Sequence, residues 1–330
     1  MRVFVTGGSG FVGRHVLRRL VDDGHQVSAL ARSDRAAGIV RSAGADPISG
    51  DMADLTAAGD RAQWTDALDG IDAVVHAAAF MEFWAPDKPF RRANLDPSIA
   101  LHRAAAASGV TRFVFVSAAS VASGTQRAAV VDETTDEGRP NIAYSRVKLA
   151  TERALLAANT PAMTTIILRP PFIWGAGMTT VNEMADAAKA SQFTWIDHGE
   201  HIMDFVHVDN LVHAVARALT HGRPGGIYYI TDGTPMPIRE FLTPLLATQG
   251  VDISDSRSVP YAIAGPFAAA LDASYRMLRR PKPPMLTNWL VTFLGRDRSY
   301  DFNAARTELG YTPQVPLAQG LAEMTRDGVG

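Results

Sequence analysis

The stretch that decides the fold is Thr6-Gly7-Gly8-Ser9-Gly10-Phe11-Val12-Gly13, at the end of the first apolar run. Its glycines at positions 7, 10 and 13 have the spacing G-x-x-G-x-x-G. In a strand–turn–helix unit, such glycines allow a tight turn, let backbone N–H groups approach a pyrophosphate and let the helix pack closely on the strand. The alternative is a glycine-rich turn without a ligand. The pattern predicts that a dinucleotide binds at Gly7, Gly8, Ser9, Gly10, Phe11, Val12 and Gly13.

Short β-rich apolar runs alternate with helix-like stretches through the first half of the chain. The predicted strands are 3–6, 26–31, 47–49, 73–76, 113–117 and 165–168. The predicted helices are 11–21, 35–43, 55–68, 94–108 and 142–158. Strands that read as continuous apolar runs between helices are typical of a parallel sheet covered on both faces. The fold class is therefore expected to be α/β, a doubly wound parallel sheet of Rossmann type, with residues 1–170 as the dinucleotide-binding domain.

After Pro170-Pro171 the alternation of predicted strands and helices becomes less regular. Helices are expected at 181–190, 210–219 and 238–248, and strands at 202–207 and 226–230. An apolar, proline-interrupted tail at 261–294 is expected to be helical. Residues 171–330 are therefore predicted to form mainly a smaller, C-terminal substrate-binding lobe, with some segments returning to the first domain.

The composition narrows the classes of function. The 330 residues are 47% hydrophobic and 20% charged with a formal net charge of −2, which is typical of a soluble globular protein and does not favour nucleic acid. There are no cysteines, and the nine histidines lack metal-ligand spacing, so no metal site is expected. No apolar run has the length of a membrane span, and the first residues do not resemble a signal peptide. A cytoplasmic location is the expectation.

The end of the second predicted strand bears on the choice of cofactor. A dinucleotide fold usually places an acidic residue roughly 20 positions after the glycines, on the ribose 2′-hydroxyl. This chain has Arg32-Ser33 there instead. A guanidinium suits a 2′-phosphate, which favours NADP(H) over NAD(H); a solvated arginine is the alternative. Gly50-Asp51-Met52, after the third strand, is predicted to bracket the adenine.

A Tyr-x-x-x-Lys pattern, Tyr144 and Lys148, lies in the predicted helix 142–158. A spacing of four puts the phenol and the ammonium on one helix face. The unperturbed pKa of tyrosine is about 10, and a nearby cation stabilises the phenolate and lowers that value. The pair therefore predicts acid/base chemistry on a carbonyl, with Lys148 also placed to hold ribose hydroxyls. A surface Tyr/Lys pair is the alternative.

With these motifs the chain resembles the extended short-chain dehydrogenases/reductases. It is most similar to the 3β-hydroxysteroid dehydrogenase-like branch, which includes bacterial 2-alkyl-3-oxoalkanoate reductases. The glycine loop, Gly50-Asp51-Met52 and the Tyr144/Lys148 pair match the family's nucleotide loop, adenine motif and catalytic pair. Asp204-Phe205-Val206-His207-Val208-Asp209-Asn210 and Gly310-Tyr311-Thr312-Pro313 match its second-lobe signatures.

The resemblance adds further expected site residues. It implies that His76, Ala77, Ala78 and Ala79 run under the nicotinamide-side ribose and that Asn94 heads the central helix, as structural support or in a proton relay. The turn in Leu168-Arg169-Pro170-Pro171-Phe172-Ile173-Trp174-Gly175 is expected to meet the nicotinamide carboxamide through Pro171, Phe172 and Ile173. The resemblance also implies a homodimer paired through helices 94–108 and 142–158.

One position departs from the family pattern. In Phe113-Val114-Phe115-Val116-Ser117-Ala118-Ala119-Ser120-Val121, the residue that is usually serine or threonine is Ala118. Neighbours on an extended segment point to opposite faces, so Ser117 cannot simply take its place unless the backbone turns. Three interpretations stay open: Ser117 or Ser120 swings in, another donor or water assists the tyrosine, or the dehydrogenase chemistry is weakened or replaced.

The expected reaction interconverts a ketone and a secondary alcohol on a bulky hydrophobic substrate, sterol-like or a β-keto acid. Aromatic residues expected near the cleft favour such a substrate: Phe80, Phe83, Trp84 and Trp174. Two alternatives remain. One is a nucleotide-sugar epimerase or dehydratase that recycles its cofactor. The other is a cofactor-binding protein with weak or altered catalysis.

Overall fold

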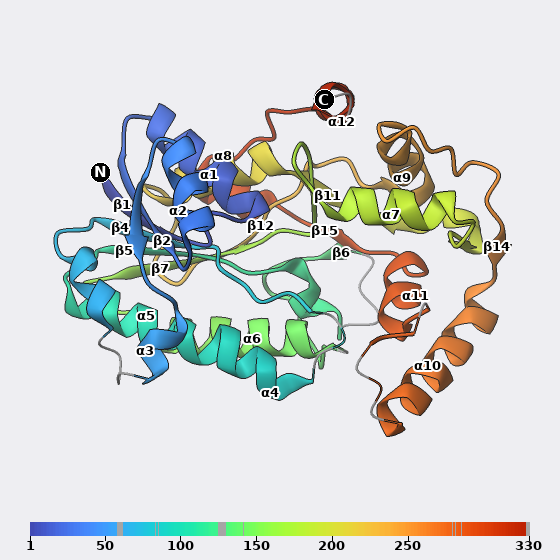
Figure 1. Cartoon of the computed structure of the whole chain (residues 1–330), viewed down its shortest axis with the longest axis horizontal. Helices are drawn as coiled ribbons and strands as arrows, with labels where there is room; N and C mark the ends of the chain where they lie inside the picture. The colour runs from blue at the N-terminus through green and yellow to red at the C-terminus, as the bar shows by residue number, and fades with distance from the viewer. Residues whose placement is uncertain are drawn as a thin grey trace.

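The computed structural model describes residues 1–57, 62–82, 84, 86–124, 130–140, 142–278, 280, 282–284 and 286–327. At its centre is a seven-stranded sheet, all parallel, in the order β3-β2-β1-β4-β5-β7-β12 (Figure 1). The strands are β1 (Arg2–Thr6), β2 (Gln26–Ala31), β3 (Asp46–Ser49), β4 (Ala73–His76), β5 (Arg112–Val116), β7 (Thr164–Arg169) and β12 (Ile227–Tyr229). The predicted α/β, doubly wound parallel sheet is confirmed.

The strand order reverses between β1 and β4. From β1 the chain builds outward through β2 to β3, then crosses back to β4 on the other side of β1. The register pairs Val3 with Ala73 and Thr6 with His76, so both strands end at the same level. In open α/β sheets ligands bind outside the carboxyl ends of the strands at such a switch point. By this rule, a ligand is expected beside the carboxyl ends of β1 and β4, at Thr6 and His76.

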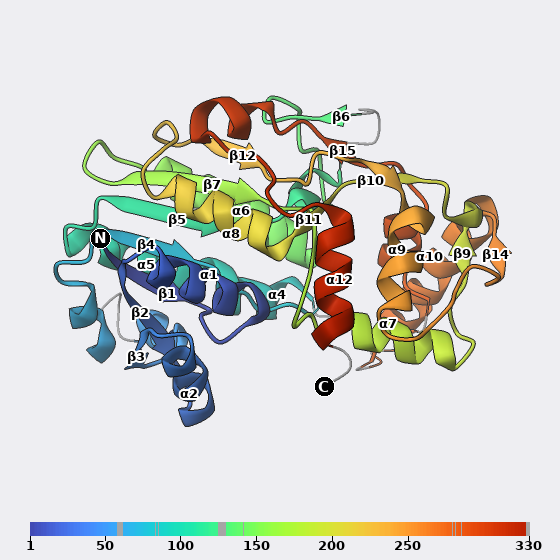
Figure 2. The same cartoon turned by 90° about the horizontal axis from the view of Figure 1, so that it is seen from above.

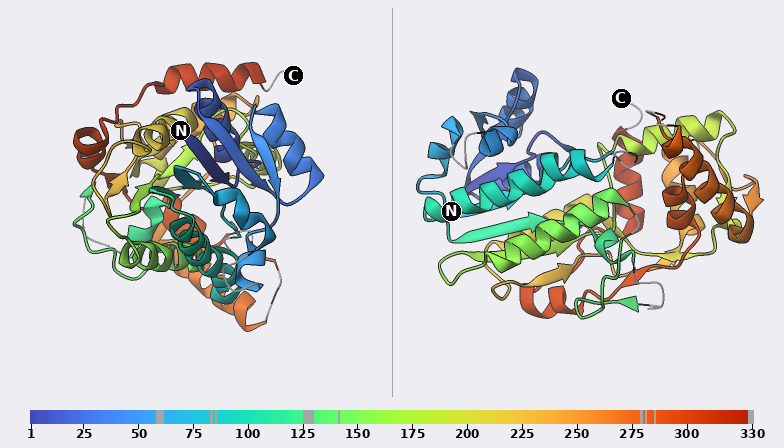
Figure 3. Two further views of the ribbon diagram at one scale, coloured as in Figure 1. Left: turned by 90° about the vertical axis from the view of Figure 1, so that its left-hand side faces the viewer. Right: turned by 90° about the horizontal axis from the view of Figure 1, so that it is seen from below.

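Helices cover both faces of this sheet (Figures 1 and 2). One face carries α1 (Phe11–Asp22), α2 (Asp34–Ser42) and α8 (Val208–Ala218). The opposite face carries α3 (Ala53–Ala57), α4 (Asp87–Phe90), α5 (Asp96–Ala107) and α6 (Ala143–Ala157), with α5 and α6 side by side in the right panel of Figure 3. Two single π-turns, η2 (Arg91–Leu95) and η5 (Ala305–Leu309), and two short 3₁₀ turns, η1 (Gln63–Leu68) and η3 (Ala119–Ala122), complete these layers.

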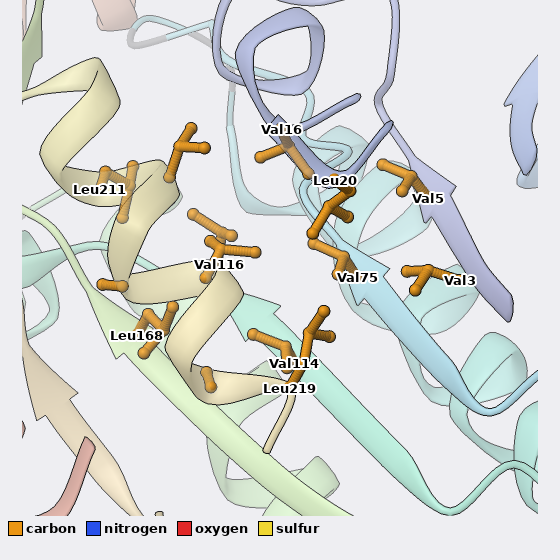
Figure 4. Close-up of a cluster of buried hydrophobic side chains, with 14 of the residues drawn as sticks. Val3, Val5, Val16, Leu20, Val75, Val114, Val116, Leu168, Leu211 and Leu219 are labelled. Carbon is orange, nitrogen blue, oxygen red and sulfur yellow. The ribbon is translucent and has the colours of Figure 1, made fainter. Parts of the chain in front are cut away.

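The core between the sheet and the first helix layer is aliphatic. Figure 4 shows Val3, Val5 and Val75 from neighbouring strands facing Val16 and Leu20 of α1. Alternate residues point to the other face, where Phe4, Phe113 and Phe115 pack with residues of α5 and α6. Because both faces are buried, the middle residues of β1, β4 and β5 are apolar, which explains the continuous apolar runs in the sequence.

The second lobe is built around its own aromatic core. Its helices are α7 (Thr180–Lys189), α9 (Ile238–Ala247), α10 (Tyr261–Met277), α11 (Asn288–Leu294) and the turn η4 (Asp197–Gly199). Its strands form pairs: β11 (Phe205–His207) with β8 (Phe172–Trp174), β10 (Ile202–Met203) with β13 (Met236–Pro237), and β14 (Ser258–Val259) with β9 (Trp195–Ile196). A further pair, β15 (Ser299–Tyr300) with β6 (Val130–Val131), lies near the end of the sheet, and α12 (Leu317–Asp327) lies between the lobes in Figure 2.

Segments after residue 170 also belong to the first core. β12 pairs with β7 at the sheet edge, and α8 packs against α1. The aliphatic residues of α8 share one buried cluster with β1 and β4.

Two predicted elements are wrong in detail. The strand expected at 202–207 is two strands, because Asp204 is buried between them and its carboxylate accepts the Tyr300 N–H at 2.7 Å. This burial raises the pKa of Asp204 to about 6. The helix expected at 55–68 is instead α3 and η1, separated by residues 58–61, which lie outside the described residues. Within the described ranges, no helix combines the length and apolar character that crossing a bilayer requires.

Candidate active site

The glycine loop joins the end of β1 to the start of α1. Gly7 has φ +78°, and a Cβ added there would lie 2.6 Å from the Ala78 nitrogen. A Cβ added at Gly13 would lie 2.0 Å from the Gly7 carbonyl oxygen. Both positions therefore require glycine, one for its backbone conformation and both for close packing.

Gly10 caps α1 without a side-chain hydrogen bond. A Cβ added at Gly10 would meet only the Gly7 oxygen, at 3.3 Å. The first turn of α1 therefore has no side-chain cap and no acidic side chain to bind its backbone N–H groups. These N–H groups lie at the switch point beside β4. Such a helix start suits a pyrophosphate, so the loop fits the dinucleotide expected from its spacing.

Arg32 and Ser33 follow β2 and begin α2. Arg32 is exposed, and Ser33 is the N-cap residue of α2, with its hydroxyl accepting the Ala36 N–H at 3.2 Å. The hydroxyl keeps its own O–H for donation. The exposed Arg32 guanidinium is a chemically suitable partner for the 2′-phosphate of NADP(H), beside a helix start that Ser33 caps and whose first turn carries Asp34.

Asp51 and Met52 follow β3. One Asp51 carboxylate oxygen accepts the Ala53 N–H at 2.9 Å at the start of α3, and the Asp51 carbonyl accepts the Trp64 indole N–H at 3.1 Å. A Cβ added at the preceding Gly50 would lie 2.2 Å from the Trp64 ring. The glycine of this motif is therefore explained by the close approach of Trp64, and Asp51 is fixed locally.

A buried hydrogen-bond chain runs along the carboxyl end of β4. His76 Nδ1 lies 2.6 Å from the Thr6 hydroxyl, and His76 Nε2 lies 2.7 Å from the Ser98 hydroxyl, which donates to the Asn94 carbonyl. Burial, with the nearby Lys148 charge, lowers the pKa of His76 to about 3. His76 is thus a neutral tether between β1, β4 and α5. Ala77 and Ala78 continue from it, with the Ala78 N–H 3.4 Å from the Thr6 hydroxyl.

Asn94 fixes the loop after β4 by both ends of its amide. Its oxygen accepts the Phe80 N–H at 2.7 Å, and its nitrogen donates to the Phe80 carbonyl at 3.0 Å. The side chain is 5% exposed. These bonds hold the segment containing Ala79 in place, which supports the structural role of Asn94 over a proton relay through its side chain.

Tyr144 and Lys148 lie on the inward face of α6. Tyr144 is 8% exposed and packs edge-on against Phe90, with ring centroids 6.1 Å apart. Lys148 Nζ lies 6.0 Å from the centre of the Tyr144 ring, 4.4 Å from that of Phe115, and donates to the Val116 carbonyl at 2.8 Å. The structure therefore brings the pair together beside the end of β5.

Burial shifts both groups in the direction of the neutral form. It raises the pKa of Tyr144, and it lowers the pKa of Lys148 to about 8, an effect opposed by the Glu152 carboxylate. A lysine with this pKa is still mostly protonated at neutral pH. The site accordingly holds a protonated phenol beside a cation that can stabilise a phenolate.

The serines after β5 occupy different environments. Ala118 has extended backbone, and the 3₁₀ turn begins only after it. Ser120, inside that turn, accepts a hydrogen bond at 2.8 Å from Ser145, the neighbour of Tyr144 on α6. The Ser117 hydroxyl is buried and has no hydrogen-bond partner among the described residues. Ser120 is thus linked to α6, and the Ser117 hydroxyl has no partner among the described residues.

Pro171, Phe172 and Ile173 follow β7 and lead into β8. The Ala119 N–H donates to the Pro170 carbonyl at 2.8 Å, which joins this turn to the one after β5. Phe172 is partly buried against aromatic residues of the second lobe. Trp174 is fully buried, and its indole N–H donates to Asp232 at 3.0 Å. Such an indole belongs to the lobe's core and does not support the expected substrate contact.

Phe80 and Trp84 differ in exposure. Phe80 is 40% exposed and lies 5.2 Å from the Phe90 ring, which in turn contacts Tyr144. Trp84 is 9% exposed and its indole N–H donates to the Arg280 carbonyl at 3.2 Å. Phe83 lies outside the described residues. Of Phe80 and Trp84, both predicted to contact substrate, Phe80 is the one with an exposed ring near the Tyr144 phenol.

A buried ion pair behind the site was not predicted. Arg169, at the end of β7, is 1% exposed and bonds Glu152 at 2.6 Å and Glu137 at 2.8 Å. Glu152 lies one turn beyond Lys148, so this pair joins α6 to the sheet. The one available signal was the spacing of four between Lys148 and Glu152.

A second polar cluster lies between α8 and α12. His207, Asp209 and Glu323 each offer an atom within 4.8 Å of the others. Asp209 also bonds His15 Nδ1 of α1 at 2.8 Å. The cluster connects three helices away from the Tyr144 face.

Comparisons with known proteins agree with this arrangement. Residues 3–231 match the family model described as the NAD dependent epimerase/dehydratase family. The chain is 35% identical to the 4-hydroxy-2-methyl-3-oxo-4-farnesyl-3,4-dihydroquinoline-1-oxide ketoreductase of Stigmatella aurantiaca, over 99% of this chain and 97% of the relative. It is 32% identical to the 2-alkyl-3-oxoalkanoate reductase of Stenotrophomonas maltophilia, over 98% of each.

Two further comparisons extend this result. The 3β-hydroxysteroid dehydrogenase/Δ5→4-isomerase of Mycobacterium tuberculosis is 32% identical, over 98% of this chain and 89% of the relative. Among solved structures, UDP-glucose 4-epimerase of Thermotoga maritima superposes with a TM-score of 0.75 at 21% identity, over 99% of this chain and 98% of that one. The structural likeness shows the fold alone. The sequence relatives span the full length, both lobes included.

Proposed function

Because the chain belongs to the NAD dependent epimerase/dehydratase family, as an extended short-chain dehydrogenase/reductase, we propose that it interconverts a ketone and a secondary alcohol on a bulky hydrophobic substrate with NADP(H). The observation that carries the proposal is the Tyr144/Lys148 pair beside the carboxyl end of β5, next to the apolar surface of Phe80 and Phe90.

The residues present fit the dinucleotide. Gly7, Gly10 and Gly13 form a turn at the start of α1. A Cβ at Gly7 or at Gly13 would clash with the backbone of this turn or of Ala78. Arg32 and Ser33 would hold the 2′-phosphate, and Lys148 the nicotinamide-side ribose. When bound, the nicotinamide exchanges a hydride with the substrate carbon.

Tyr144 moves the proton in this mechanism. Its phenol donates to the carbonyl oxygen in reduction and accepts from the alcohol in oxidation. The Lys148 cation stabilises the phenolate left after donation, which offsets the effect of burial on the phenol pKa. Phe90 packs on the Tyr144 ring and fixes its direction.

The carbonyl needs a second donor because position 118 is alanine. Ser120, bonded to Ser145 on the catalytic helix, is the better placed substitute for orienting the substrate oxygen. The buried hydroxyl of Ser117, which has no partner among the described residues, is the alternative.

The hydrophobic substrate class has two supports. Phe80 presents open apolar surface near the phenol, and the relatives' names specify a farnesylated quinoline oxide, an alkyl-oxoalkanoate and a steroid. A long-chain β-keto acid or a sterol-like ketone therefore suits the site.

Net cofactor turnover separates this proposal from a sugar-nucleotide epimerase. With a panel of 2-alkyl-3-oxo acids and 3-keto steroids, we expect NADPH to be oxidised in proportion to the ketone consumed. UDP- and dTDP-sugars are the comparison substrates. Conversion of a sugar nucleotide without net change in cofactor would contradict the proposal.

The pH dependence of reduction follows from Lys148. Its pKa is lowered to about 8, so the cation is present below that pH and is lost above it. The pKa of Tyr144 is raised, so the phenol keeps its proton through the same range. We expect kcat/KM for ketone reduction to fall as the pH rises through about 8. A profile flat to well above this value would show that the Lys148 charge is not required.

Arg32→Gln is expected to weaken NADPH binding by about tenfold or more, because a charge-assisted hydrogen bond to phosphate contributes ~1.5–3 kcal/mol. NADH affinity should stay near that of the unaltered protein. Fluorescence titration of both cofactors measures this. Arg41→Gln, an exposed arginine at the other end of α2, is the matched control. Equal loss for both cofactors would contradict the assignment of Arg32.

Ala118→Ser restores the hydroxyl that the family usually carries. If Ser120 already serves as the donor, the variant should change kcat little, whereas Ser120→Ala should lower kcat by ~10²-fold. The Ser145→Ala variant, which removes the donor to Ser120, is a control for the support of that hydroxyl. Activity that arises only in Ala118→Ser would favour a cofactor-binding protein with little native catalysis.

The expected homodimer and cytoplasmic location remain part of the proposal. Helices α5 and α6 lie side by side on one face of the sheet, as a pairing surface between two copies would require.

A further inference from the structure

Helix α10 carries an apolar face that the rest of the described chain does not cover. Ile263 is 64% exposed, Phe267 60% and Met277 79%, and Leu278 just beyond the helix is 61% exposed. The first three recur at a helical spacing of four and ten, so they share one side. The opposite side, with Ala264 and Ala268, packs into the second lobe.

The exposed charges at the carboxyl end of α10 are basic, whereas the exposed acidic residues Glu82 and Asp87 lie on the side of the loop after β4. The single acidic residue of α10, Asp272, accepts the Asn288 N–H, while Arg276, Arg280 and Lys282 are exposed at the carboxyl end. They lie next to Met277 and Leu278. Three exposed basic residues thus lie beside the most exposed apolar side chains of α10.

The same end of α10 is attached to the loop beside the active site. The Arg276 guanidinium lies 4.3 Å from the centre of the Trp84 ring, and the Trp84 indole N–H donates to the Arg280 carbonyl. That loop also exposes Phe80 and Met81, the latter by 60%. Figure 1 shows α10 at the outer edge of the second lobe. Exposed apolar side chains thus lie on both sides of the contact between Trp84 and the end of α10.

We propose that this surface, Phe80 and Met81 together with Ile263, Phe267, Met277 and Leu278, docks on an anionic phospholipid bilayer. The apolar side chains enter the interface, and Arg276, Arg280 and Lys282 bind the anionic headgroups. An apolar helix face with flanking cations is the composition that interfacial helices use. Docking places the loop beside Tyr144 at the membrane, where a water-insoluble ketone is dissolved.

Vesicle sedimentation tests this without substrate or cofactor. The full chain is mixed with vesicles of phosphatidylcholine alone or with phosphatidylglycerol added. We expect binding to the phosphatidylglycerol vesicles, weaker binding to phosphatidylcholine, and release by salt. The double variant Phe267→Ser/Met277→Ser should bind at least about tenfold more weakly, because two buried apolar side chains are lost. Absence of binding by the unaltered chain would overturn the proposal.

Matched variants separate the electrostatic contribution of the basic residues from the apolar contribution of the exposed side chains. Arg280→Gln/Lys282→Gln should weaken binding to the anionic vesicles by about tenfold or more and leave binding to phosphatidylcholine unchanged. Arg18→Gln/Arg41→Gln, on the first lobe, and Val130→Ser, another exposed apolar residue, should bind as the unaltered chain does. Equal losses in these controls would contradict a specific surface.

The oligomeric state tests whether a second copy of this chain, and not a membrane, covers the apolar face of α10. If α10 were covered by a second copy, Phe267→Ser/Met277→Ser would change the sedimentation coefficient in the absence of lipid, and the proposal would be overturned. Unchanged circular dichroism and thermal midpoint show that the variant is folded. Turnover of a short, water-soluble ketone reports the catalytic proposal separately, because it needs no membrane.

Discussion

Tyr144→Phe is expected to lower kcat for ketone reduction by ~10³-fold, within the range that a positioned general acid contributes. The variant keeps the ring that packs on Phe90 and removes only the proton donor. NADPH binding should persist, because the glycine loop and Arg32 are untouched. Single-turnover reduction and a cofactor titration on the same preparation measure the two effects.

Tyr228→Phe is the matched control. Its hydroxyl donates to Glu308 at 2.6 Å at the sheet edge, so its loss should affect stability and not kcat. If Tyr144→Phe kept near-full turnover, another group would be the acid, and the proposed mechanism would fail. If both variants lost activity equally, the effect would be structural.

Lys148→Met should lower kcat/KM by ~10²-fold or more, because the charge that stabilises the phenolate is lost. The same substitution should make the folded protein more stable, although it lowers kcat/KM. Burial lowers the pKa of Lys148 from 10.5 to about 8, so below pH 8 the folded protein bears the cost of a buried charge. Removing that charge should raise the free energy of unfolding by about 3 kcal/mol at pH 7, the equivalent of that pKa shift.

The stability gain should disappear at high pH. Between pH 8 and 10.5 the lysine is neutral in the folded protein and charged in the unfolded chain, so the difference shrinks and is gone above the unfolded pKa. Urea unfolding at several pH values measures this, with Lys189→Met, at an exposed position of α7, as the control. A variant destabilised at pH 7 would indicate that Lys148 acts through packing, and a variant with unchanged kcat/KM would exclude its catalytic role.

The predictions from sequence were most accurate where the structure is local. The central strands, the glycine loop and the Tyr144/Lys148 spacing each depend on residues within a few positions of one another. The requirement for glycine at position 13 is also local, because a Cβ there would clash with Gly7, six residues earlier in the same loop. These features could be predicted because their causes lie within single strands, turns and helix faces.

The predictions failed where contacts join distant segments. Asp204 breaks a strand because Tyr300, far along the chain, donates to it. Trp84 is held by the end of α10, a contact that its place in the sequence does not show. The structural role expected of Asn94 is supported, but its partner Phe80 could not be seen from spacing. Ala118 is an intermediate case: its departure from the family pattern was visible in the sequence, but the Ser120–Ser145 bond was not.

The most direct test of the central claim is deuterium transfer from 4,4-dideuterated NADPH, labelled at both C4 positions so that either hydride face is detected, to a 2-alkyl-3-oxo acid, followed by mass spectrometry of the product. The expected result is one deuterium on the new carbinol carbon for each NADPH oxidised, a result that Tyr144→Phe slows and Tyr228→Phe does not. An unlabelled product, or a sugar nucleotide epimerised while the cofactor stays reduced, would contradict the assignment of this chain as a ketone reductase.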